Sequence, residues 1–141
     1  MDVIKFAEPI LNPETLKAID LHLEALYESK TTIDIGQKMA DVELKSSQIR
    51  NLENLVMSTK RFSEIINFIK NQTGKDKKGK WPLIADTLLH QLEALEDKAR
   101  EIGKDNPGIT FEVKRQLARG WVKQIVAHYF FADSKKKKDK L

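Results

Sequence analysis

Residues 82–102 read PLIADTLLHQLEALEDKAREI, and the spacing of their apolar side chains decides the fold class. Apolar residues recur every three or four positions, which places them on one narrow face of an α-helix. Pro82 suits the first helical turn, where its missing N–H is not needed, and Gly103 is expected to end the helix at the C′ position. The predicted apolar face comprises Ile84, Leu88, Leu92, Leu95, Ala99 and Ile102.

The same helical spacing occurs on both sides of this stretch. Asn12 followed by Pro13 is a strong start signal, because asparagine caps the first turn and proline fits its first position. Ser46 or Ser47 can cap a longer helix in the same way. Residues 30–45 stay open between a loop and a short helix. The helices predicted besides 82–102 are 13–29, 47–71 and 110–132.

These segments predict an all-α fold, a compact bundle of four to five helices in a single domain over residues 1–133. Residues 1–11 are expected to be extended or irregular. No segment shows the apolar alternation of a β-strand. Residues 134–141 read SKKKKDKL, and a run of like charges of this kind predicts a disordered lysine-rich tail.

Composition excludes several classes of protein. The chain has no cysteine, which rules out thiolate catalysis, cysteine-ligated zinc and disulfide bonds. Its N-terminus has no apolar core of a signal peptide, and no stretch approaches the ~18 apolar residues of a membrane span. We therefore expect a cytoplasmic protein without a membrane partner. The net charge of +4 is mild, so the placement of the charges matters more than their sum.

No residue pattern indicates catalysis. His90 shares the polar side of 82–102 with Asp86, Glu93 and Asp97, but a bundle metal site needs inward carboxylates and a Glu-x-x-His order on facing helices. A solvated acidic face explains this group better. His128 lies on the apolar face of 110–132 and is expected to be a buried, hydrogen-bonded core residue. We therefore expect no enzyme, no catalytic residue, no metal and no cofactor.

Two basic stripes favour a polyanionic partner. On the helix predicted over 47–71, Arg50 and Arg61 share one side, opposite the apolar face. A second stripe follows i, i+4, i+8 spacing on 110–132, and Phe130 lies in the same sector, where it could stack on a base or contact a subunit. The acidic side of 82–102 would repel phosphate, so the two sides of the bundle should differ in potential. The second stripe comprises Arg115, Arg119 and Lys123.

Two segments resemble one known family. Residues 44–52, LKSSQIRNL, are similar to the start of the main helix in the small Csm-type subunit of type III-A CRISPR effector complexes. Residues 121–131, WVKQIVAHYFF, resemble the aromatic C-terminal helix of that family. The chain length and the order of helices are also similar.

The resemblance implies a non-catalytic RNA-binding subunit that serves antiviral defence. Such subunits stack in several copies inside a ribonucleoprotein, where they contact the backbone of the target RNA paired to the guide RNA. Other effector subunits bind the guide and cut. The resemblance assigns an RNA contact to Arg50 alone, whereas the other basic residues and Phe130 are predicted from their helical positions.

Two alternatives stay open. Residues 35–52 could form a DNA-binding helix-turn-helix, although Leu44 and Arg50 occupy positions where that motif has glycine and an apolar residue. The chain could also be a protein–protein adaptor that uses the narrow 82–102 face for pairing and binds no nucleic acid.

Overall fold

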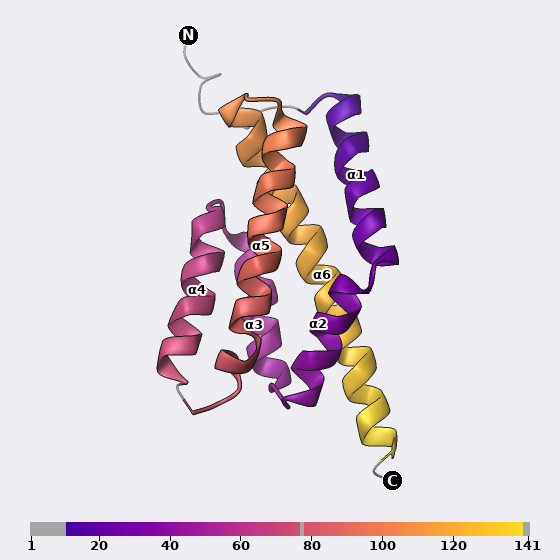
Figure 1. Cartoon of the computed structure of the whole chain (residues 1–141), viewed down its shortest axis with the longest axis vertical. Coiled ribbons are helices and arrows are strands. Elements are labelled where there is room, and N and C mark those ends of the chain that lie inside the picture. The colour runs from indigo at the N-terminus through magenta and orange to yellow at the C-terminus, as the bar shows by residue number, and fades with distance from the viewer. Residues whose placement is uncertain (1–10, 77, 140–141) are drawn as a thin grey trace.

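The computed structural model describes residues 11–76 and 78–139, and all regular secondary structure in this part of the chain is helical. This confirms the all-α class, with more helices than the four to five expected, because residues 30–45 contain a helix and residues 47–71 divide into two (Figure 1). The expectation for residues 1–10 lies outside the described part. The helices are α1 (Pro13–Glu28), α2 (Lys30–Asp41), α3 (Ser46–Ser58), α4 (Phe62–Lys75), α5 (Trp81–Gly103) and α6 (Pro107–Asp139).

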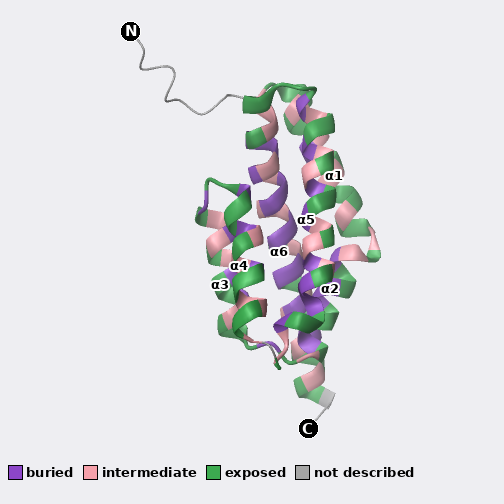
Figure 2. Cartoon of the chain, turned by 60° about the vertical axis from the view of Figure 1, so that its left-hand side comes forward, coloured by how far each residue is buried: buried purple, intermediate pink, exposed green. Residues whose placement is uncertain are grey.

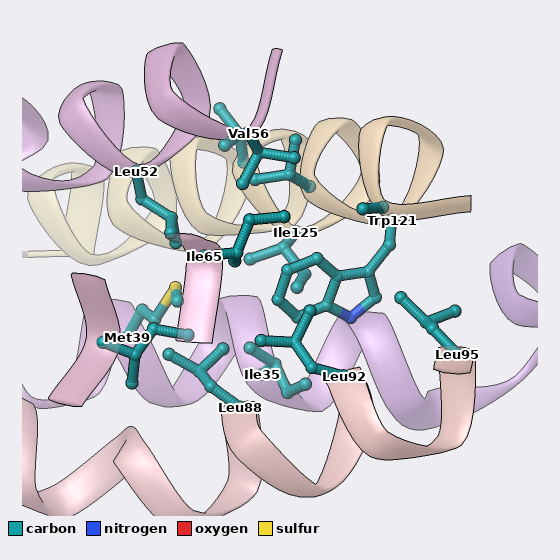
Figure 3. Close-up of a cluster of buried hydrophobic side chains, with 14 of the residues drawn as sticks. Ile35, Met39, Leu52, Val56, Ile65, Leu88, Leu92, Leu95, Trp121 and Ile125 are labelled. Atoms are coloured by element: carbon teal, nitrogen blue, oxygen red, sulfur yellow. The ribbon is translucent and has the colours of Figure 1, made fainter. Parts of the chain in front are cut away.

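α6 is the central element, and it packs against each of the other helices. Figure 2 shows its buried middle section surrounded by the rest of the bundle. Trp121 and Ile125 have no exposed surface. They meet apolar side chains from α2, α3, α4 and α5 in one contiguous core (Figure 3). Burial of large side chains of this kind stabilises a fold by about 1.5 to 3 kcal/mol each.

The apolar face predicted over 82–102 is the face that α5 turns to the core. Five of its six predicted members are buried, and Ile102 is half-buried at the end of the helix. Within residues 11–76 and 78–139, no helix is both long and apolar enough to cross a lipid bilayer.

The single helix predicted over 47–71 was wrong, because the chain leaves helical geometry at Thr59. The Thr59 hydroxyl accepts a hydrogen bond from the Arg61 backbone N–H at 3.2 Å and donates one to the Glu64 carboxylate at 2.7 Å. A threonine that bonds nearby groups in this way competes with helical hydrogen bonding. The break shifts the helical phase. A single helix over 47–71 would turn Ile66 to the core along with Leu52, whereas Ile65 is buried and Ile66 is half-buried, and Arg61 does not continue the stripe of Arg50.

The disordered tail predicted over 134–141 was also wrong for residues 134–139, which extend α6 by further turns. Lys136 Nζ donates to the Ala40 carbonyl oxygen at 2.8 Å, and Lys137 pairs with Asp133 at 3.0 Å. Lysines at a helix C-terminus also interact favourably with its dipole. The mutual repulsion of the lysines at 135–138 is therefore offset by contacts that bind this end of α6 to the bundle. Residues 140 and 141 lie outside the described part.

The end of α5 differs from the expected C′ glycine. Gly103 is still helical, and the left-handed cap is Lys104, with φ of 48°. Gly103 serves close packing instead, since a Cβ there would overlap the Thr110 side chain. The glycine allows α6 to begin directly against the end of α5.

α1 lies at the edge of the bundle. The apolar residues of 13–29 recur at helical spacing, which predicts one buried face, but only part of that face is covered. Leu16 and Tyr27 are exposed, and Ile19 is the one buried residue of this helix. Gln124 of α6 donates a side-chain hydrogen bond to the Leu23 carbonyl oxygen at 2.9 Å. α1 thus leaves much of its apolar surface uncovered by the rest of the described chain.

Tyr129→Phe is expected to lower the free energy of unfolding by about 1 to 3 kcal/mol. The buried Tyr129 hydroxyl donates a hydrogen bond to the Leu44 carbonyl oxygen at 2.6 Å, and removing the hydroxyl leaves that acceptor unpaired. Burial, and then the nearby Asp133 carboxylate, raise the pKa of Tyr129. The contribution should therefore be full below about pH 10 and fade as the pH rises through the raised pKa. Urea denaturation measures both effects. Tyr27→Phe, at an exposed tyrosine, is the control, and an equal loss there would contradict this role for Tyr129.

Candidate nucleic-acid interface

The two segments that carry the family resemblance meet where α3 packs against α6. The Arg50 guanidinium of α3 lies 4.6 Å from the centroid of the Phe130 ring of α6. Arg50 also pairs with Glu53 at 2.7 Å, one turn along α3. These contacts orient the guanidinium while 57% of the side chain stays exposed. An oriented, accessible arginine is well suited to bidentate contact with a phosphate.

Phe130 is positioned as a support for Arg50. Its ring is half-buried and packs edge-on against Tyr129, with centroids 5.0 Å apart and planes at 73°. Because Arg50 lies over the ring, base stacking on that face would require the guanidinium to move. The geometry therefore favours a role for Phe130 in supporting Arg50. Stacking of a base on Phe130 remains a prediction.

The continuation of α6 adds a residue to the second stripe. The helical spacing from Arg119 to Phe130 predicts that these residues share one side of the helix. On that side Lys123 is exposed and Arg119 is half-buried. Lys137 follows Phe130 by seven residues, two helical turns, and so lies on the same side of α6. The stripe from Arg119 to Lys137 is about 27 Å long at 1.5 Å per residue. Sequence reasoning missed Lys137 because it ended the helix at residue 132, although the seven-residue spacing was a usable signal.

Two of the predicted binding residues lie elsewhere. Arg115 is 9% exposed and pairs with the buried Glu112 at 2.8 Å, while Gln116 donates to the same carboxylate at 3.2 Å. Its charge is thus largely neutralised inside the protein. Arg61 is exposed but caps the start of α4, beyond the break after α3. The structure therefore brings Arg50 and Phe130 together. Arg119 and Lys123 share a side of α6 with Phe130 by their helical spacing, whereas Arg115 is buried and Arg61 lies at the start of α4.

A recess of about 480 Å³ continues the basic surface at the start of α3. Lys45, Lys136 and Lys137 line it, together with the first two serines of α3. Glu43 and Asp133 also line it, so the excess of positive charge is modest. The lysines nevertheless extend the positive surface beyond Arg50, and Lys45 and Lys136 are further residues that helical periodicity could not place.

The two sides of the bundle differ in charge. The carboxylates predicted on the polar side of 82–102 are all exposed on α5, and α1 adds four more against a single lysine. A polyanion would therefore be repelled most by α1, because the α5 carboxylates Asp97 and Glu101 pair with Arg100 and Lys98 of the same helix. The exposed α5 carboxylates are Asp86, Glu93, Asp97 and Glu101.

The histidines do not assemble a recognisable reaction site. His90 is exposed, and no group of three or more metal-ligating side chains occurs within residues 11–76 and 78–139. His128 is half-buried beneath Tyr27, and its Nε2 has no hydrogen-bond partner among the described residues, contrary to the hydrogen-bonded residue expected. Burial, and then the Lys98 ammonium, lower the pKa of His22, which keeps this imidazole neutral at neutral pH.

Comparison with known proteins found no matching family model, no similar curated protein and no similar solved structure.

Proposed function

We propose that this protein is the non-catalytic, RNA-binding small subunit of a type III CRISPR effector ribonucleoprotein, contacting the backbone of a target RNA paired to its guide RNA. The observation that carries the proposal is the Arg50–Phe130 contact. It joins the two segments that resemble the small-subunit family, and it holds an exposed guanidinium against α6, the helix that carries Arg119, Lys123 and Lys137.

The physical character of the surface supports this role. In RNA-guided complexes base pairing reads the sequence, and the protein needs only to recognise backbone charge and helix shape. The α3–α6 surface is elongated and carries arginine and lysine. Its partners would be the target strand of the guide–target duplex, the other effector subunits and further copies of this chain, in antiviral defence.

Arg50→Ala is expected to weaken binding to a guide–target RNA duplex by roughly tenfold, because one charge-assisted phosphate contact is lost. The salt dependence should also fall by about one unit in the slope of log K against log salt. Fluorescence anisotropy across a salt series measures both quantities. The control is Arg100→Ala on α5, since Arg100 is 59% exposed and pairs with Asp97 at 2.9 Å, much as Arg50 pairs with Glu53.

The same titrations separate the rival functions. Equal losses for Arg50→Ala and Arg100→Ala would show that the α3–α6 surface is not the RNA site. Tight, sequence-selective binding of duplex DNA would support a helix-turn-helix protein instead. An absence of binding even at low salt would support a protein–protein adaptor.

A further inference from the structure

We propose that α1 is a hinged, autoinhibitory cover, which opens as a unit while α2 to α6 stay folded and thereby widens the nucleic-acid surface of α6. The opening follows from the packing of α1 alone, whereas its effect on RNA rests on the proposed function.

α1 is held to the bundle by little buried surface. Ile19 is its one buried residue, and Leu21 and Tyr27 are 61% and 58% exposed. On the side toward α5, a hollow of about 590 Å³ lies between α1 and the end of α5. Because one buried side chain contributes little to the core, detaching this helix should cost far less than unfolding the whole bundle.

α1 also covers polar groups of α6 that it does not satisfy. Gln124 donates a hydrogen bond to the Leu23 carbonyl oxygen at 2.9 Å, but its Oε1 is buried and has no partner among the described residues. The Nε2 of His128, which lies beneath Tyr27, is buried without a described partner as well. Each such atom costs free energy while α1 is docked, and water would satisfy it once α1 has moved away.

One residue connects α1 to α2 and can act as the hinge. Ser29 is both the C-cap of α1 and the N-cap of α2, and its backbone is extended, with φ of −80° and ψ of 161°. Figure 1 shows a sharp bend between the two helices, with α1 at the outer edge of the bundle. Rotation about a residue that belongs to neither helix would move α1 without disturbing α2.

The docked helix places negative charge beside the basic stripe of α6. Asp20 and Glu24 are exposed, and they precede Tyr27 by seven and three residues, so they share its side of α1. That side is turned toward α6, since the Tyr27 ring lies over His128. The two carboxylates therefore oppose the approach of a polyanion to this flank of α6, and the opening would remove them.

Opening would also uncover a polar side of α6. Gly120, Gln124 and His128 follow i, i+4, i+8 spacing, and the first two directly follow basic residues of the stripe. Gly120 is covered by Leu23, since a Cβ there would lie 2.6 Å from Leu23 Cδ1. Glycine permits the close approach of a backbone, and an amide and an imidazole can donate hydrogen bonds to phosphate. A docked α1 would thus compete with RNA for these groups.

His22 makes the opening sensitive to acid. It lines the hollow from α1, and burial, followed by the Lys98 ammonium, lowers its pKa although Glu101 opposes this shift. The closed state therefore favours the neutral imidazole, and it should lose stability as the pH falls below the ordinary histidine value of 6.5. The charged residues that line the hollow with His22 are Glu14, Lys98, Glu101 and Lys104.

Hydrogen exchange of the full chain, followed by mass spectrometry, tests the opening. Amides of α1 should be protected at least about tenfold less than those in the middle of α6, because they exchange through a local opening. Ile19→Ala should speed exchange in α1 by at least about tenfold more and leave α6 unchanged. The control is Ile49→Ala, at a buried isoleucine of α3, which should speed exchange in α6 as well. Equal protection of α1 and α6, or faster exchange of α6 in Ile19→Ala, would overturn the proposal.

The same experiment measures the acid sensitivity. After correction for the intrinsic exchange rate, the opening of α1 should increase about threefold or more from about pH 7.5 to about pH 5.5. His22→Asn should abolish this increase, whereas His90→Asn, at an exposed histidine of α5, should preserve it. An increase that persists in His22→Asn would refute the part assigned to His22.

RNA binding separates this inference from the proposed function. A guide–target duplex should speed exchange in α1, and Ile19→Ala should tighten duplex binding by about threefold or more, because RNA selects the open state. Asp20→Asn combined with Glu24→Gln should also tighten binding. Asp86→Asn combined with Glu93→Gln removes the same charge from α5 and should have a smaller effect.

The two failures are distinguishable. Slower exchange of α1 with the duplex bound, or normal RNA binding without a local opening, would refute the cover alone. A local opening of α1 in a protein that binds no RNA would refute the proposed function alone.

Discussion

Replacing Arg50, Lys123 and Lys137 together with glutamate is expected to reduce RNA affinity by at least about a hundredfold at low salt. Each cation can neutralise one phosphate, and a carboxylate in its place adds repulsion. The slope of log K against log salt should fall by about two to three units. The effect should exceed that of Arg50→Ala because the three residues lie along one surface, where a single backbone could contact all of them.

The control for this variant must carry the same change in net charge. Lys17, Lys38 and Lys70 are exposed lysines on α1, α2 and α4, and replacing them with glutamate also lowers the net charge by six. Affinity should fall much less in this control, through long-range repulsion alone. Similar losses in the two triple variants would mean that RNA binding follows net charge, and that α3 and α6 present no defined surface.

Gly36→Ala is expected to destabilise the fold by about 1 to 3 kcal/mol, the range for overpacking a well-packed interior. A Cβ at Gly36 would lie 2.6 Å from His128 Cβ and 2.7 Å from the Tyr129 backbone nitrogen. These atoms belong to α6 close to its backbone, so they cannot rotate away and α2 would have to move. Thermal or urea unfolding followed by circular dichroism measures the loss.

Gly74→Ala on α4 is the matched control, because nothing lies within 4 Å of a Cβ at that position. Alanine favours helix over glycine, so this variant should be neutral or more stable by up to about 1 kcal/mol. An unaffected Gly36→Ala variant would show that the α2–α6 crossing can relax. The prediction also bears on RNA binding. The α2–α6 crossing is followed by a turn in which the Leu44 carbonyl accepts a hydrogen bond from Tyr129, and this turn leads directly into α3, the helix that carries Arg50.

Much of the candidate site could be anticipated from periodicity, and its failures have physical causes. Arg50, Lys123 and Phe130 were placed correctly relative to their own helices, because the apolar side of a helix determines which side is left for solvent. Arg61 was grouped with Arg50 only because the hydrogen bonds of Thr59 that end α3 are not visible as a pattern. Arg115 was predicted to be accessible because helical periodicity describes one helix by itself. It shows neither that other helices enclose α6 nor that Arg115 pairs with the buried Glu112.

The sequence by itself determined the all-helical class, the extent of α1 and α5 and the apolar face of α5, because helical spacing, caps and prolines act within one or two turns. The tertiary structure alone decided that α6 continues through its lysines, that Gly36 and Gly103 serve close approach, and that Arg50 lies over Phe130. Each of these features depends on atoms that are distant along the chain, such as the Ala40 carbonyl oxygen, which accepts a hydrogen bond from Lys136 Nζ. Local preference is weak beside the packing and hydrogen bonding that such neighbours supply.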